Sequence, residues 1–100
     1  MVGEPADIRV ERFTWTPEAA AHIQRHGVSP ASVEEVLANA PQFFEDLPSK
    51  SGTHIMLGPT ASGRFLFVVI APGVLEGEWV VVTAYPYSRS RAMRHYRGTA

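Results

Sequence analysis

The amino-acid sequence predicts an α+β fold, and three features of its patterning lead to this prediction. The chain up to Asn39 contains two segments with helical spacing and helix-capping residues. Four short runs rich in β-branched and aromatic residues follow, and an arginine-rich segment ends the chain. Strands joined by short turns form an antiparallel meander, and helices pack on one side of such a sheet. We therefore expect an N-terminal strand, two helices, a four-stranded antiparallel meander and a C-terminal helix.

Length and composition set the frame for this fold. With 100 residues, 45% of them hydrophobic, the chain can form a single domain over residues 1–100, with a core from about residue 8 to residue 97. It contains no cysteine, which excludes disulfides and thiolate chemistry. No apolar run reaches about 18 residues, and "MVGEPADIRV" lacks the pattern of a signal peptide. We expect a cytoplasmic protein with no membrane partner.

The first strand and helix follow from the residues before the "RHGVSP" stretch. Apolar and polar residues alternate through Ile8–Trp15, with one slip, which predicts a strand with a bulge. Thr16 is a good N-cap and Pro17 a good first helical residue. One stripe of this helix carries Ala19, His22, Ile23 and His26.

The second helix is predicted from about Pro30 to Asn39. Ser29 can cap it, Pro30 suits its first position, and Pro41 ends it. Ser32 and Glu35 also have the spacing of a capping box. Its apolar face consists of Val33, Val36 and Leu37.

The second half of the chain predicts strands and one helix. The runs are "QFFEDL", "THIMLG", "RFLFVVIA" and "EWVVVTAY", with turns at "PTASG" and "PGVLEG". Phe65–Ala71 and Trp79–Ala84 are apolar on both faces, which predicts central strands. The last helix spans about Ser88 to Arg97. Its inner face is expected to carry Ala92, Met93 and Tyr96, and its outer face Arg91, Arg94 and Arg97.

The stretch "RHGVSP", Arg25 to Pro30, has two interpretations. As helix punctuation, Gly27 ends the first helix in the left-handed conformation and Val28 folds back onto its last turn. The second interpretation adds chemistry, because Arg25 and His26 bring a phosphate-binding cation and a titratable imidazole to the turn. From the residues alone, a histidine that interacts with the last helical carbonyls is the simpler interpretation.

The charges are unevenly distributed although the net charge is −1. Residues 1–48 contain three arginines and eight acids, a net of −5, whereas residues 49–100 contain six basic residues and two acids, a net of +4. The last 13 residues contain no acid and four arginines, Arg89, Arg91, Arg94 and Arg97. A local basic surface can attract phosphate. A solvated helix end is the alternative interpretation.

Taken together, these segments resemble the BrnT-type toxins of bacterial type II toxin–antitoxin systems over about residues 13–97. The most specific part of the resemblance is the spacing from Phe13-Thr14-Trp15 to Arg25-His26-Gly27-Val28. It continues through "FFEDLP", "GRFLFVVI" and "VVVTA" into the arginine-rich helix. The resemblance implies a RelE-like fold, cleavage of RNA, and a ribbon-helix-helix antitoxin that wraps the toxin and binds operator DNA.

A metal-free ribonuclease attacks phosphorus with the neighbouring 2′-OH, and this chemistry needs particular side chains. It needs a proton acceptor, a proton donor and cations beside the phosphoryl oxygens. His26 is the candidate base or acid, and Arg25 beside it would bind phosphate. Arg64 matches the family's Gly-Arg and is the candidate transition-state cation.

The sequence departs from the family at the end of the last strand. Family members usually have Ser-Ala-Arg there and a Glu in the following helix, whereas this chain has Thr83-Ala84-Tyr85 followed by Pro86 and lacks the Glu. Tyr85 can stack a base or donate a hydrogen bond, but it supplies no charge, and Tyr87 can do similar work. Two hypotheses stay open: an active endoribonuclease, and a catalytically inactive RelE-like module that binds a partner protein. A structural homodimer is a third.

The remaining candidates complete the predicted site. Arg89, Arg91 and Arg94 would hold the RNA backbone, and His95 is a weaker acid candidate, whereas Tyr96 belongs to the core. His22 and His26 have metal-ligand spacing, but no Cys or H-E-x-x-H pattern accompanies them, so we expect no metal and no cofactor. The expected partners are RNA and a cognate antitoxin, in a homodimer or a hetero-oligomer.

Overall fold

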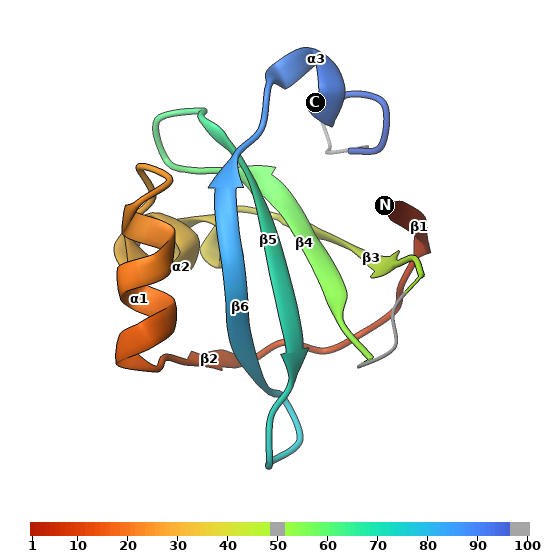
Figure 1. Ribbon diagram of the computed structural model, residues 1–100. Helices are drawn as coiled ribbons and strands as arrows, with labels where there is room; N and C mark the ends of the chain where they lie inside the picture. Colours follow the sequence, from red (N-terminus) through yellow and green to blue (C-terminus); the bar gives the residue numbers. More distant parts are fainter. Residues whose placement is uncertain (49–51, 97–100) are drawn as a thin grey trace.

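Six strands and three helices make up the described part of the chain, residues 1–48 and 52–96 of this computed structural model (Figure 1). In chain order they are β1 (Val2–Pro5), β2 (Arg12–Thr14), α1 (Pro17–Gln24), α2 (Pro30–Ala38), β3 (Gln42–Asp46), β4 (His54–Pro59), β5 (Phe65–Pro72), β6 (Glu78–Pro86) and α3 (Arg89–Ala92). The predicted α+β class is confirmed, and so are both helices of the first half.

The strands form one sheet in the order β1-β3-β4-β5-β6-β2. Strands β3 to β6 pair antiparallel with their chain neighbours, which confirms the expected meander. β5 lies between β4 and β6 along its length and is central, as its apolar pattern predicts. β6 is central only in part, because β2 pairs with it from Glu78 to Val80 and leaves the later residues of that edge open.

The prediction for the N-terminal strand is wrong in extent and incomplete. Pairing covers Arg12–Thr14 instead of Ile8–Trp15, and β2 runs parallel to β6. Before β2 the backbone bonds to a side chain and to a loop. The Arg9 carbonyl accepts from the Trp79 indole at 3.0 Å, and the Glu11 amide donates to the Gly77 carbonyl at 2.8 Å. An unexpected strand, β1, pairs antiparallel with β3. The sheet is therefore mixed and has six strands instead of five.

Helices α1 and α2 cover one face of this sheet (Figure 1). Ile23 of α1 and Val33 and Val36 of α2 are fully buried. They pack into one cluster with inward side chains of β4, β5 and β6, among them Met56 and Val68. Burial of each such aliphatic side chain contributes about 1.5–3 kcal/mol, so this layer supplies much of the stability.

The third helix packs against the opposite face, so the prediction that helices gather on one side is wrong for α3. Ala92 is fully buried in a second cluster formed by Phe44, Ile55, Leu57, Phe65 and Phe67. The sheet needs cover on both faces because β4 and β5 are apolar on both faces. This second cluster is the floor of the candidate site.

Helix α3 is also shorter than predicted. It ends at Ala92, and a turn follows in which the Tyr96 amide donates to the Ala92 carbonyl at 2.8 Å. The Tyr96 hydroxyl donates to the Ala40 carbonyl at 2.8 Å, and its ring contacts Phe65. Its predicted packing role is thus confirmed, whereas Met93 is exposed. Arg97, the predicted last helical residue, lies outside the described residues.

The helix caps follow the sequence with one exception. Thr16 Oγ1 accepts from the Ala19 amide and Ser29 Oγ from the Ser32 amide, each at 3.1 Å. The capping box predicted for Ser32 and Glu35 is wrong, because Ser32 lies inside the helix. The Glu35 carboxylate instead accepts from the Ala61 amide at 3.1 Å and ties α2 to the β4–β5 turn.

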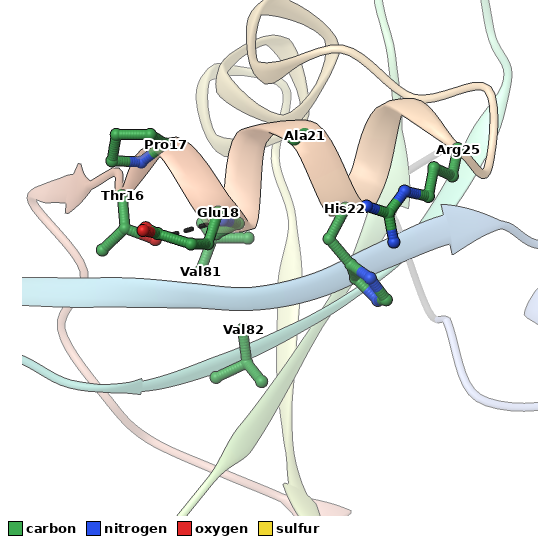
Figure 2. Close-up of a pocket in the computed structure, with 9 residues that line it drawn as sticks. Thr16, Pro17, Glu18, Ala21, His22, Arg25, Val81 and Val82 are labelled. Carbon is green, nitrogen blue, oxygen red and sulfur yellow. Dashed lines mark hydrogen bonds between the residues drawn. The ribbon is translucent and has the colours of Figure 1, made fainter.

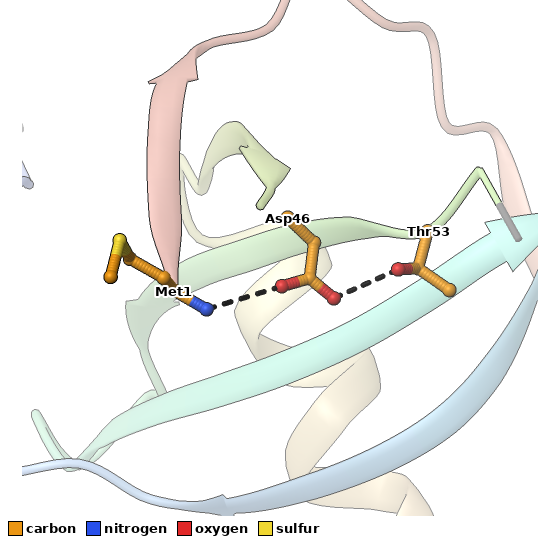
Figure 3. Close-up of polar contacts among 3 residues, drawn as sticks. All are labelled: Met1, Asp46 and Thr53. Atoms are coloured by element: carbon orange, nitrogen blue, oxygen red, sulfur yellow. Dashed lines mark hydrogen bonds and ion pairs between the residues drawn. The ribbon is translucent and has the colours of Figure 1, made fainter. Parts of the chain in front are cut away.

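A polar cluster fixes the β1 side of the sheet (Figure 3). The Asp46 carboxylate lies 3.4 Å from the Met1 amino group through Oδ1 and accepts from Thr53 Oγ1 at 2.8 Å through Oδ2. These bonds connect β1, β3 and the residue before β4. Among the described residues, no helix is long and apolar enough to cross a membrane.

Candidate functional site

The predicted site residues gather at one end of the sheet. Figure 1 shows that the turn after α1, the β4–β5 connection, the end of β6 and helix α3 share this end, whereas the β5–β6 hairpin lies at the other. Because β5 starts and β6 ends here, residues far apart in sequence become neighbours. The candidates on these segments are Arg25, His26, Arg64, Tyr85, Tyr87, Arg89, Arg91 and Arg94.

The turn that holds His26 is built as the sequence predicts. Gly27 adopts a φ of 75°, and its amide donates to the Gln24 carbonyl at 3.0 Å. The Val28 amide reaches back to the Ile23 carbonyl at 3.1 Å, and the Val28 side chain is buried. This Schellman-type ending leaves His26 exposed at the end of the helix. The punctuation interpretation is thus confirmed, and it leaves the imidazole available to solvent.

His26 lies beside Tyr85. Their ring centroids are 6.3 Å apart with an interplanar angle of 65°, an edge-on contact. The contact joins the end of α1 to the end of β6, so two predicted site residues from opposite halves of the chain meet. The contact places the exposed imidazole of His26 against the edge of the Tyr85 ring.

Tyr85 belongs to a row of aromatic rings that we call the aromatic platform: Tyr85, Phe67 and Tyr87. Tyr85 stacks on Phe67 at 5.0 Å with an angle of 16°, and Phe67 lies 5.0 Å from Tyr87. The Arg91 guanidinium lies 4.6 Å above the Tyr87 ring, a cation–π contact. Aromatic faces beside a guanidinium can bind unpaired bases and the phosphates between them.

Burial raises the pKa of Tyr85 above its usual 10.0. The neighbouring Tyr87 and Asp46 raise this pKa further, and Arg91 opposes them. Tyr85 therefore keeps its proton at neutral pH and can donate a hydrogen bond.

Arg64 and Arg25 flank the His26 turn on different sides. Arg64 Nη2 lies 3.8 Å from the point where a Cβ on Gly27 would stand, so its guanidinium borders the turn. Arg25 lines a cavity of about 800 Å³ between α1 and β6, together with His22 and Val82 (Figure 2). Arg25 directly precedes His26 in the chain, and the Arg64 guanidinium borders the turn that follows His26. A guanidinium in either place can bind phosphate oxygens.

Three further candidates lie on α3 or in the turn after it. The Arg89 guanidinium stands 5.7 Å from the Phe65 ring centroid and lines a cavity of about 620 Å³ with Tyr96. Arg94 is exposed in the turn after α3. His95 packs against Phe44 of β3 and is separated from His26 by two intervening strands, so the structure does not bring it into the site.

Two residues of this site were not predicted. Phe67 is the centre of the aromatic platform. In the run "RFLFVVI" every residue after Arg64 is apolar, so the sequence does not show which residues face α1 and α2 and which face the opposite side. His22 lies next to His26 with ring centroids 5.1 Å apart, and its i, i+4 spacing was the available signal. Within residues 1–48 and 52–96, no three His, Cys, Asp or Glu side chains form a group that could hold a metal ion.

The sheet order and helix placement define a small α+β protein with the fold of a ribonuclease toxin. The solved structure that shows this is the 1.1 Å crystal structure of BrnT, the ribonuclease toxin of Brucella abortus. It matches this chain with a TM-score of 0.53 and 19% sequence identity, over 83% of this chain and 100% of that chain. The expected BrnT-type fold is confirmed. Comparisons with protein-family profiles and with curated proteins find no match.

Proposed function

We propose that this protein is the toxin of a bacterial type II toxin–antitoxin system and acts in the cytoplasm as a metal-independent endoribonuclease. One observation carries the proposal: an imidazole, a guanidinium and the aromatic platform converge at one end of the sheet from separate elements. His26 contacts Tyr85, and Arg64 borders the His26 turn. The fold shared with a ribonuclease toxin supports the same function.

In this proposal, His26 exchanges a proton during cleavage and the arginines stabilise charge. The 2′-oxygen of RNA attacks phosphorus, and an imidazole can exchange the proton near neutral pH without tuning. Arg64 and Arg25 bind the non-bridging oxygens, whose negative charge grows in the transition state. The Tyr85 hydroxyl stays protonated and donates to the same oxygens.

The aromatic platform and α3 would hold the single strand. Tyr87 is half-buried, and its ring with the Arg91 guanidinium over it would contact a base and the adjacent phosphate. Arg89 and Arg94 extend the row of cations along α3 and bind the backbone. The substrate is therefore unpaired RNA, because a base inside a duplex cannot reach these rings.

The test is cleavage of a long single-stranded RNA by the purified protein in EDTA, with and without ribosomes. We expect cleavage that leaves 2′,3′-cyclic phosphate ends. His26→Ala should lower the rate about 10²- to 10⁴-fold, the usual effect of removing an acid or base. Arg64→Ala should lower it about 10²- to 10³-fold, as for a lost transition-state donor.

Arg9→Ala is the matched control, because Arg9 lines a cavity with residues of the β5–β6 hairpin and pairs with Glu11. All variants need the wild-type circular dichroism spectrum and melting temperature. Absence of cleavage by the folded wild type, even with ribosomes, would contradict the proposal.

The proposed partner is a ribbon-helix-helix antitoxin. If it covers the site, co-expression of this chain with the protein encoded beside it should restore growth and suppress RNA cleavage. A stable complex in size-exclusion chromatography that still cleaves RNA at the wild-type rate would contradict this mode of neutralisation.

A second candidate function is a catalytically inactive module that binds a partner protein. The apolar hairpin tip favours it, since Val74 is 94% and Leu75 60% exposed. Exposed apolar pairs at a tip can enter a partner's groove. Val74→Ser with Leu75→Ser should then abolish partner capture without changing the melting temperature.

A further inference from the structure

His22 carries a second imidazole beside that of His26. The two rings are 5.1 Å apart with an interplanar angle of 81°, and both residues are exposed. They stand four residues apart, which puts them on the same side of the helix and its final turn. The structure therefore contains two adjacent imidazoles, not one, beside the proposed site.

The surroundings of His22 make it accessible to a substrate. It lines the cavity of about 800 Å³ between α1 and β6, together with Arg25 and Val82 (Figure 2). This cavity exists because β2 leaves β6 after Val80, so the edge beyond it is open and Val82 is 45% exposed. A phosphodiester that enters here meets an imidazole and a guanidinium together.

The other acid–base group of this cavity is farther from Arg25. Glu18 also lines the cavity, but it stands in the first turn of α1, and Figure 2 shows its carboxylate turned toward Thr16. His22 lies between Glu18 and Arg25 along the helix. His22 thus lies beside His26, with 5.1 Å between the ring centroids, and lines the cavity together with Arg25.

We propose that His22 and His26 form the acid–base pair of the cleavage reaction, with the scissile phosphate beside Arg25. This inference rests on the proposed ribonuclease function. One imidazole takes the 2′-OH proton as the 2′-oxygen bonds to phosphorus. The bond from phosphorus to the 5′-oxygen breaks, and the other, protonated imidazole gives its proton to that oxygen. The products are a 2′,3′-cyclic phosphate and a 5′-hydroxyl, and no other reactant is needed.

The test compares two substrates cleaved by wild type, His22→Gln and His26→Gln. One is a ribodinucleotide, and the other is uridine 3′-(4-nitrophenyl phosphate), whose leaving group departs without a proton. His22→Gln should cleave the dinucleotide about 10²-fold more slowly or worse. The variant that lacks the acid keeps its rate on the nitrophenyl ester, and the variant that lacks the base loses cleavage of both substrates. Gln24→Ala, an exposed change on the same helix, is the control.

Binding of a 2′-deoxy oligonucleotide, which cannot be cleaved, separates catalysis from affinity. The acid–base pair is supported if both histidine variants lose cleavage of the dinucleotide and only one of them loses cleavage of the nitrophenyl ester. Binding and circular dichroism should be unchanged. A wild-type rate for His22→Gln on the dinucleotide overturns it, and so does a loss that weaker binding accounts for in full. A wild type that cleaves neither these substrates nor the long single-stranded RNA, even with ribosomes, overturns the ribonuclease proposal itself. If it cleaves only the long RNA, the two histidine variants are compared on that RNA, and a wild-type rate for His22→Gln there overturns the pair.

Discussion

Gly27 and Tyr85 show how single residues set the properties of the site. Gly27 holds a φ of 75°, which lets the chain reverse immediately after His26. Tyr85 replaces the arginine found in the family that the sequence resembles, and its ring packs between Phe67 and His26. The first residue ends the helix directly after His26, and the second contacts the His26 imidazole. Each role leads to a measurable prediction.

Gly27→Ala should destabilise the protein by about 1–2 kcal/mol, because alanine is strained in the left-handed conformation. The new Cβ would lie 3.8 Å from Arg64 Nη2, an ordinary contact, so the loss is conformational and not steric. Urea unfolding measures it. Gly27→Asn, which tolerates this conformation, should lose less, and equal losses would contradict the explanation.

The raised pKa of Tyr85 predicts a loss of stability in alkali. The folded state holds the Tyr85 proton more tightly than the unfolded state, so this contribution is fully present below pH 10.0. It declines as the pH rises through the folded pKa. Urea unfolding at increasing pH should therefore show a fall in stability above pH 10.0 that is smaller in Tyr85→Phe. Identical pH profiles for the two proteins would refute the assignment.

At the scale of elements, the site depends on how α1 and β6 are placed against each other. α1 starts at the Thr16 cap, packs through Ile23 and ends at the His26 turn. β6 is paired by β2 only up to Val80, and its free edge forms the wall of the cavity opposite α1. A shift of α1 would move His22 and His26 together, because the helix and its final turn carry both side chains.

Thr16→Ala should therefore weaken α1 by about 1 kcal/mol, since the Ala19 amide loses its acceptor. For a chain of this size that corresponds to a fall of about 4–8 °C in melting temperature. Thr16→Ser keeps the acceptor and should stay near wild type. Calorimetry distinguishes them, and an unchanged melting temperature for Thr16→Ala would show that the cap contributes nothing.

At the scale of the whole molecule, charge is sorted along the sheet. Arginines of the site end are exposed around His26 and α3, whereas at the hairpin end Arg9 and Arg12 pair with Glu11, and Glu76 and Glu78 lie nearby. The net charge of −1 hides this separation. A local field of this kind orients a polyanion toward one end without making the whole chain basic.

The dependence of RNA affinity on salt concentration should accordingly be weak, because only a few arginines contact phosphate. Arg91→Ala should reduce the slope of log K against log salt by about 0.7, the value for one phosphate of a single strand. Arg9→Ala, near the hairpin end, should leave the slope unchanged. Fluorescence anisotropy with a 2′-deoxy oligonucleotide measures both. Equal slopes for Arg91→Ala and wild type would remove Arg91 from the binding surface.

The sequence by itself determined the parts of the fold that local chemistry controls. The Thr16 and Ser29 caps, the Gly27 ending and the β3–β6 meander depend on residues close together in the chain, so their patterns are legible. Adjacent candidates such as Arg25 and His26 could be named for the same reason. The sequence did not determine which distant side chains these candidates contact.

Only the tertiary structure decided which distant segments meet. The pairing of β1 with β3 and of β2 with β6 joins segments more than thirty residues apart, and short strands leave little periodicity to detect. β4 and β5 are apolar on both faces, so their sequence pattern does not show which face α3 covers. In the structure α3 packs on the face opposite α1 and α2. The contact of His26 with Tyr85, the stacking on Phe67 and the cavity beside His22 all arise from these long-range choices. Packing free energy fixes them, and it depends on the whole chain at once.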